Sequence, residues 1–286
     1  MTKKRLSLIM AVSLAVALAL MLAAAGCGDN SEEPAEPEKP ALSGTLELSG
    51  STTVLPLAQE AADMFMDENP DVTVNVQGGG SSVGISNVAE GVVDIGNASR
   101  GLKDEEKDLG LMDHEIALDV IVVIVHKDVP LEGLTADQVY NIFTGKVTNW
   151  KDVGGPDQTI NVVVRDEASG TREMFDEKAL KKEVPMAGAI ETNSNGIMRQ
   201  TVSSTPYSIG YISLGYLDSS VKALEYGGVE GSKETAVDKT YPLSRYLHMF
   251  TKGSATGLAE AFIEFVLSDE FQNEVVAEEY IPMTEI

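Results

Sequence analysis

Predicted strands and helices alternate along most of this chain of 286 residues, and this alternation restricts the fold more than any other feature of the sequence. Residues 45–49 and 72–76 alternate between apolar and polar side chains, which predicts strands. Residues 57–69 carry apolar side chains at helical spacing, and residues 81–90 are interpreted as a second helix. The alternation continues through residues 92–95, 104–109, 116–126, 135–143 and 160–164. Strands separated by helices are typical of an α/β fold with mainly parallel central sheets flanked by helices.

The first 26 residues have the pattern of an export signal. Three basic residues at positions 3–5 precede an uncharged segment, 7–25, which ends in small side chains directly before Cys27. The segment is long enough to span a bilayer, but its position and its small residues favour a cleaved signal peptide. The sequence LAAAGC around the cleavage point resembles a bacterial lipobox. We therefore expect Cys27 to be lipidated and to anchor the protein to the outer face of a bacterial cell membrane. An ordinary cleaved signal with an incidental cysteine is the alternative.

Residues 27–43 are predicted to be the lipidated cysteine followed by a disordered acidic tether, because Pro, Glu and Ser dominate and cannot form a core. The whole chain carries 45 acidic and 21 basic residues, a net charge of −24, which argues against a nucleic-acid-binding protein. Its one cysteine excludes a disulfide framework, and its three scattered histidines leave little for a metal site. We expect neither a metal nor a cofactor.

Four junctions that follow predicted strands are rich in Ser, Thr and Gly: residues 49–53, 78–82, 94–100 and 165–172. Hydroxyl groups and the backbone N–H groups at helix starts bind anions, and glycine lets the backbone approach closely. The same residue types are also ordinary helix caps. Four such junctions in one chain favour an oxyanion site. Arg165 is the strongest candidate for a clamp, because it directly follows an apolar strand.

Six motifs resemble those of the phosphate-binding proteins of bacterial phosphate ABC transporters, the PstS family: SGSTTVLPL, GGGSSVGI, GVVDIGNASRGL, FTGKVTNWKDVGG, VVVRDEASGTREMF and STPYSIGYISLGY. The resemblance covers nearly all of residues 44–286. It implies a two-lobed periplasmic-binding-protein fold of type II, with two inter-lobe crossings near His126 and Tyr241. Lobe I would comprise residues 44–125 plus 241–286, and lobe II residues 126–240.

The same resemblance implies which residues bind phosphate in a cleft between the lobes. They are Thr52, Thr53, Ser81, Ser99, Arg165, Ser169, Gly170 and Thr171, with Ser51, Ser82 and Arg100 as secondary candidates. One position departs from the family. Where the best-known members have an aspartate that accepts the phosphate proton, this chain has Ser99. The argument for rejecting sulfate is weaker without that carboxylate, and Asp166 and Glu167 are candidate substitutes or orient Arg165.

The resemblance implies a monomeric binding protein that captures inorganic phosphate and delivers it to the permease subunits of an ABC transporter. Two alternatives stay open at this point: a binding protein for sulfate, molybdate or tungstate, and a surface adhesin or sensor on the same fold. An enzyme is not expected. The serine in EASGT lacks the preceding glycine of a nucleophile elbow, and neither a P-loop lysine nor a metal cluster is recognisable.

Overall fold

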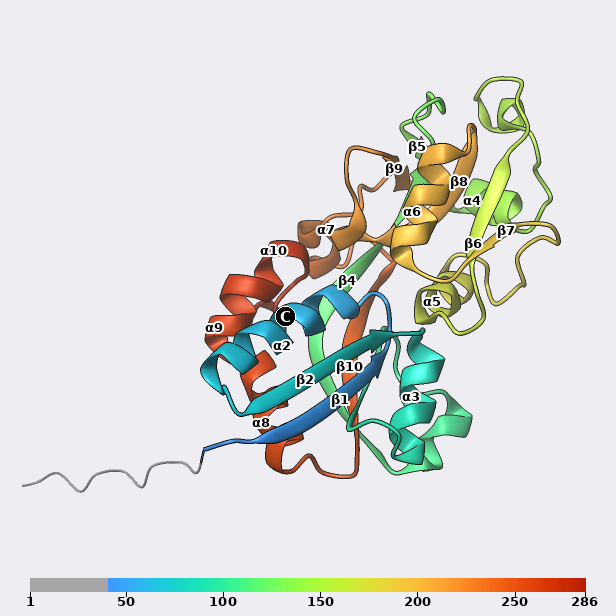
Figure 1. Cartoon of the computed structure of the whole chain (residues 1–286). Helices are drawn as coiled ribbons and strands as arrows, with labels where there is room; N and C mark the ends of the chain where they lie inside the picture. The colour runs from blue at the N-terminus through green and yellow to red at the C-terminus, as the bar shows by residue number, and fades with distance from the viewer. Residues whose placement is uncertain (1–40) are drawn as a thin grey trace, which may run out of the picture. The chain divides into compact units, whose positions relative to one another are not determined.

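The computed structural model describes residues 41–286 (Figure 1). The predicted signal peptide, the lipidation site Cys27 and nearly all of the predicted tether lie outside the described residues. Among residues 41–286, none of the helices has both the length and the apolar character needed to cross a membrane.

Ten strands form the sheet structure of the described part: β1 (Gly44–Gly50), β2 (Val72–Gly78), β3 (Ile95–Ala98), β4 (Leu111–Val125), β5 (Gly133–Leu134), β6 (Asn161–Arg165), β7 (Ile190–Thr192), β8 (Ser208–Ser213), β9 (Lys222–Tyr226) and β10 (Ser244–Lys252). Their order is β2-β1-β3-β10-β4-β8-β6-β7, and β9 pairs with β4 and β5. Five of the nine strand pairings among these residues are parallel, and the four antiparallel ones all involve β4 or β10. The outer strands therefore have the expected parallel arrangement, whereas the two central strands run against their neighbours.

The helices are α2 (Leu55–Glu68), α3 (Ser81–Glu90), α4 (Ala136–Phe143), α5 (Gly170–Lys178), α6 (Asn195–Ser204), α7 (Lys233–Val237), α8 (Gly257–Val266), α9 (Asp269–Phe271) and α10 (Ala277–Glu279). Shorter helical turns are η1 (Asp104–Leu109), η2 (Trp150–Val153), η3 (Leu214–Tyr216), η4 (Gln272–Val276) and η5 (Met283–Glu285). Local sequence explains several ends. Thr135 caps α4 by accepting from the N–H of Gln138, and Gly91 ends α3 in the left-handed conformation.

Most predicted elements are confirmed within a few residues, but two are wrong in detail. The strand expected at 92–95 is β3, Ile95–Ala98, because Gly91 ends α3 and leaves Val92 in an exposed turn. The helix expected at 104–109 is the 3-10 turn η1, none of whose residues is buried. A helix without a buried face gains little from packing, so its propensity alone decides its form.

Two large hydrophobic cores lie at the two ends of β4 and β10. The first core packs β1, β2, α2 and α8 around residues such as Phe65 and Phe262. The second core packs β6, β8, α4 and α5 around residues such as Trp150 and Phe175. A small cluster under α3 adjoins the first core. Figure 1 shows β4 and β10 running side by side from one region to the other.

Strands β4 and β10 each run from one core to the other. Along β4, Ala117 packs in the first core and the next residue, Leu118, packs in the second. Near β10, Leu243 packs in the second core and Leu247 in the first. The lobe boundaries at residues 125/126 and 240/241 stay a prediction. The loops after β1, β3 and β6 all lead to the region between the cores, which is where open α/β sheets place their ligands.

Candidate functional site

The chain makes a close turn at the carboxyl end of β1. Gly50 has a φ of 138°, and a Cβ there would meet the carbonyl oxygen of Asn97 at 2.1 Å. Only glycine fits, because other residues rarely adopt this φ and would clash with the neighbouring strand. In the turn that follows, Ser51 Oγ accepts a hydrogen bond of 3.1 Å from the backbone N–H of Thr53. This turn places Thr52 and Thr53 directly before α2.

The N-termini of α3 and α5 are in direct contact. A Cβ on Gly170, the first residue of α5, would meet Ser81 Oγ at 2.3 Å and Ser99 Oγ at 2.9 Å. Ser81 Oγ accepts from the backbone N–H of Ser99 at 3.0 Å, and the two hydroxyls lie 3.2 Å apart. The N–H of Ser82 donates to the carbonyl of Ala168 at 3.2 Å. Each helix N-terminus carries partial positive charge, so two in contact favour an anion between them.

Threonine hydroxyls from the turn after β1 contact residues of the second core. Thr53 Oγ1 lies 3.1 Å from Thr171 Oγ1, and Arg165 Nη2 donates to Thr52 Oγ1 at 3.2 Å. The structure thus brings together the loops after β1, β3 and β6 and the starts of α3 and α5. It places all eight primary candidates close to one another and buries every one of them: Thr52, Thr53, Ser81, Ser99, Arg165, Ser169, Gly170 and Thr171.

Several candidate side chains also have structural partners. Ser169 Oγ caps α5 by accepting from the N–H of Arg172 at 3.2 Å. The Ser51 hydroxyl supports its own turn, and the Ser82 hydroxyl accepts from Arg100 Nη2 at 3.2 Å. Arg100 is buried but faces acids, with Glu106 at 2.6 Å and Glu173 at 2.7 Å. The secondary candidates Ser51, Ser82 and Arg100 therefore surround the site and hold its loops.

Sequence reasoning missed Arg245 and Asp119. Arg245 Nη2 donates to Thr53 Oγ1 at 3.1 Å, to Thr171 Oγ1 at 2.9 Å and to Asp119 Oδ2 at 2.9 Å. Both residues are almost fully buried and lie opposite each other on β10 and β4. One signal was available, since Asp119 interrupts the apolar run of residues 116–125 and a buried carboxylate needs a partner.

Asn195, Tyr216 and Tyr280 are further residues that sequence reasoning missed. Asn195 Nδ2 donates to Thr53 Oγ1 at 2.9 Å. Tyr216 and Tyr280 donate their hydroxyl protons to the carbonyls of Thr52 and Thr53, at 2.6 Å and 2.8 Å. Burial raises the pKa of Tyr216 to about 12 and that of Tyr280 well above its usual value, so both remain donors at neutral pH. These two hydrogen bonds hold the backbone of the turn in place.

The hydrogen-bond count at the two threonines leaves one proton free. A hydroxyl oxygen accepts at most two hydrogen bonds and donates one. Asn195 and Arg245 only donate to this pair, and one of the two protons on Arg245 Nη2 goes to Asp119. One threonine hydroxyl therefore donates to the other across 3.1 Å, and the second hydroxyl keeps its proton for an acceptor in the site.

Arg165 supplies an unbalanced positive charge. Its side chain is 1% exposed, and its Nε and Nη1 have no hydrogen-bond partner among residues 41–286. Burial lowers the pKa of Arg165, but an arginine stays protonated in proteins. Arg245, by contrast, is neutralised by Asp119, whose pKa burial raises while Arg245 and Ser213 oppose the rise. A buried cation with free donors calls for an anion.

A metal-dependent site finds no support in this geometry. Within residues 41–286, no cluster of His, Cys, Asp and Glu is arranged to hold a metal ion. The groups that meet here are hydroxyls, backbone N–H groups and guanidinium donors, which are partners of oxyanions.

Comparison with known proteins identifies the class to which this fold and site belong. The sequence profile of the PBP superfamily domain matches residues 35–270, so the chain is a member of the periplasmic-binding-protein superfamily. The predicted two-lobed fold of this superfamily is confirmed.

Individual relatives show to which family within this superfamily the chain belongs. The chain is 39% identical over 276 residues to the phosphate-binding protein PstS of Bacillus subtilis (strain 168), covering 93% of this chain and 91% of that one. It is 31% identical over 238 residues to PstS of Borreliella burgdorferi, covering 79% and 85%. A crystal structure from Clostridium perfringens, described as a phosphate ABC transporter substrate-binding protein with bound phosphate, has a TM-score of 0.81 and 41% identity over 84% of this chain and all of that one. The chain belongs to the PstS family.

Proposed function

We propose that this protein captures inorganic phosphate between its two lobes and delivers it to an ABC transporter. The observation that carries the proposal is Arg165, a buried cation with two nitrogens that have no partner among the described residues. Hydroxyl groups from the loops after β1, β3 and β6 lie close to it. The relatives named above support the choice of ligand, because they are described as phosphate-binding proteins and one holds phosphate.

Each part of the site has a proposed role. Arg165 clamps two phosphate oxygens through Nε and Nη1, and the free hydroxyl proton of the Thr53–Thr171 pair is donated to a third. The starts of α3 and α5 direct their dipoles at the same charge. Ser81, Ser99, Ser169 and Thr52 offer hydroxyls that either donate or accept. Since each hydrogen bond to a charged group contributes roughly 1.5–3 kcal/mol, half a dozen would give micromolar affinity or better.

Choice among oxyanions depends on an acceptor for the phosphate proton. A carboxylate acceptor rejects sulfate, because sulfate has no proton to offer at neutral pH. Ser99 stands at the position where other members have that aspartate. Its hydroxyl can accept a hydrogen bond from the phosphate proton, but it can equally donate one to sulfate, so it does not exclude sulfate. Asp166 adjoins the clamp and has a buried Oδ1 without a hydrogen-bond partner among residues 41–286, so we propose it as the discriminating group.

The position in the cell is also part of the proposal. Cys27 would carry the lipid that anchors the protein to the outer face of the membrane, and the acidic tether would let the folded part reach the permease. The protein would act as a monomer and not as an enzyme, in keeping with relatives named for phosphate binding.

Calorimetry on residues 28–286, stripped of ligand by unfolding and refolding, tests the proposal. Phosphate, sulfate, molybdate and tungstate are titrated in turn. Tight binding of one phosphate with no response to sulfate is the expected result. Tight binding of sulfate or a metal oxyanion in preference to phosphate would mean that this anion, and not phosphate, is the ligand. If none of the four anions binds, an adhesin or sensor is favoured.

A further inference from the structure

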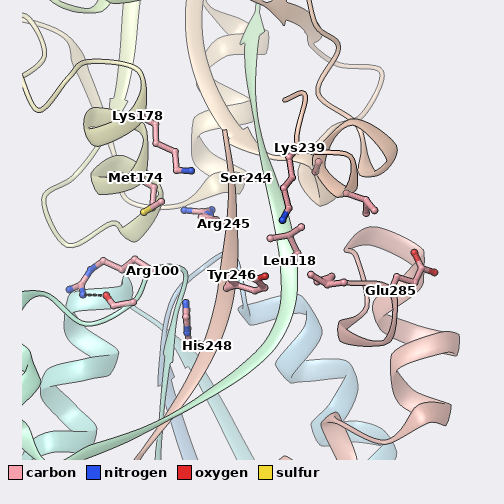
Figure 2. Close-up of a pocket in the computed structure, with 14 residues that line it drawn as sticks. Arg100, Leu118, Met174, Lys178, Lys239, Ser244, Arg245, Tyr246, His248 and Glu285 are labelled. Carbon is pink, nitrogen blue, oxygen red and sulfur yellow. Dashed lines mark hydrogen bonds between the residues drawn. The ribbon is translucent and has the colours of Figure 1, made fainter. Parts of the chain in front are cut away.

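A cavity of about 640 Å³ lies beside β10, between the loop after β3 and the end of α5 (Figure 2). Of the candidate residues found from the sequence, only Arg100 lines it. Arg245 connects this cavity to the proposed phosphate site, since its side chain reaches both. The cavity lies outside the proposed function, and its volume is that of a pocket for a small organic molecule rather than for a single phosphate ion.

Basic side chains outnumber acidic ones in the lining of this cavity, although Arg100 is paired with Glu106 and Glu173 and Arg245 with Asp119. Four of its fourteen lining residues are Lys or Arg and only one, Glu285, is acidic, whereas acidic residues outnumber basic ones 45 to 21 in the whole chain. Lys178 donates only to the carbonyl of Pro242, at 3.2 Å, and Lys239 forms no ion pair within residues 41–286. His248 is paired with Asp113 at 2.8 Å. The two lysines are therefore available for an anionic ligand.

Arg245 adds a buried donor to the same cavity. Its side chain is almost fully buried, and its Nε and Nη2 are bonded to Asp119, Thr53 and Thr171. Its Nη1 has no hydrogen-bond partner among the described residues. Figure 2 shows the Arg245 head group between Lys178 and Met174 on one side and Arg100 on the other. A buried guanidinium nitrogen without an acceptor is costly unless a ligand supplies one.

Part of the remaining wall of the cavity is apolar. Leu118, Met174 and Tyr246 line it beside the basic groups. We propose that this cavity binds a small phosphomonoester, with its phosphate group on Lys178, Lys239 and Nη1 of Arg245 and its organic group against the apolar wall. Free phosphate shares the same charged group but leaves the wall uncovered. The ester is too large for the phosphate site itself, where the starts of α3 and α5 are in contact.

Calorimetry with glycerol 3-phosphate tests this site on residues 28–286 already saturated with phosphate. We expect one ester molecule to bind while the first phosphate stays in place. The variant carrying Lys178→Gln and Lys239→Asn should bind the ester at least about tenfold more weakly, because each lost charged hydrogen bond is worth about a factor of ten. Asparagine is chosen at position 239 because the backbone there has a φ of 63°.

A matched control carries Lys151→Gln and Lys182→Asn. It removes the same two charges from exposed positions outside the cavity, and Lys182 has a φ of 68°. This control should bind the ester as the unchanged protein does. A second titration, of inorganic phosphate into the phosphate-loaded protein, distinguishes the ester from free phosphate.

Three results would overturn the proposal: no ester binding at millimolar concentration, binding that displaces the first phosphate, or equal binding by the lysine variant and the unchanged protein. Lysine-dependent binding of a second free phosphate without ester binding would also overturn it. If the protein binds the ester but does not bind phosphate tightly, the ester site is supported and the proposed function is wrong.

Discussion

At position 165 a lysine would keep the positive charge but lose the planar, forked guanidinium. Arg165 is buried, and its Nε and Nη1 have no hydrogen-bond partner within residues 41–286, so both are available to one ligand. We expect Arg165→Lys to lower phosphate affinity about 10- to 100-fold, the loss of one or two charged hydrogen bonds, as measured by calorimetry. Arg199→Lys, at an arginine that bonds Tyr216 and Asp218, is the control. Equal phosphate affinity of Arg165→Lys and the unchanged protein would exclude the clamp.

Glycine at position 170 allows the two helix starts to meet. An added Cβ would lie 2.3 Å from Ser81 Oγ, on the opposite side of the site. Since the clash arises between two helices that pack in different hydrophobic clusters, Gly170→Ala should weaken phosphate binding about tenfold or more while changing the melting temperature little. Gly196→Ala, on α6 with no atom within 4 Å of the new Cβ, is the matched control. Normal affinity in Gly170→Ala would mean that the lobes do not close on this contact.

Single residues also show how far the sequence predicts the site. Arg165, Ser169 and Thr171 are recognisable because they stand in one short motif after an apolar strand. Arg245 is not, because its role depends on the pairing of β10 with β4 across more than a hundred residues. Such long-range antiparallel pairing leaves no local pattern. Asp119 was detectable in principle, as the only charge within the apolar run of residues 116–125.

At the scale of elements, α5 is linked to the loop after β3 by an ion-pair cluster. Glu173 lies 2.7 Å from Arg100 Nε and 3.2 Å from Lys103 Nζ, and these elements pack in different cores. We expect Glu173→Gln to speed phosphate release by a few-fold, because a half-exposed pair contributes up to about 1 kcal/mol to the closed form. Glu177→Gln on the same helix is the control for stopped-flow measurements, because Glu177 pairs only with Lys182, at 3.6 Å, within residues 41–286. Identical release rates in the two variants would exclude this role.

The same helix gives a pH dependence of stability. Burial raises the pKa of Asp176 to about 6, while the hydrogen bond from Arg172 opposes the rise. The unfolded chain therefore loses this proton first, so the group favours folding at low pH and this contribution is lost as pH rises through about 6. The unfolding free energy, measured with urea, should therefore fall between pH 4 and pH 7. In Asp176→Asn this fall should be smaller by about 1–2 kcal/mol than in the unchanged protein. Asp152→Asn, at an exposed aspartate, is the control and should not change this fall. If the unfolding free energy of Asp176→Asn depends on pH as that of the unchanged protein does, the argument is contradicted.

Elements differ in how well the sequence predicts them. Helix α3 begins and ends where the glycines around it indicate, because Gly80 and Gly91 both adopt positive φ. Strand β3 was misplaced because Val92 and Val93 have strand propensity but follow the cap of α3. The antiparallel centre of the sheet was not predicted, since strands of both directions have the same local pattern.

For the whole molecule, the net charge repels a phosphate anion, whereas the groups in the site attract it. The net charge of −24 repels phosphate at long range, and salt screens that repulsion. The contacts within the site are buried and little screened. Raising NaCl from about 50 to 500 mM should therefore increase the association rate by a few-fold and change the Kd less than about fivefold, as measured by stopped-flow kinetics and calorimetry. Glu173→Gln should respond even less in its release rate, because its screened ion pair is gone. If the Kd instead rises more than about tenfold with salt, exposed basic groups capture the phosphate and Arg165 is not its main binding residue.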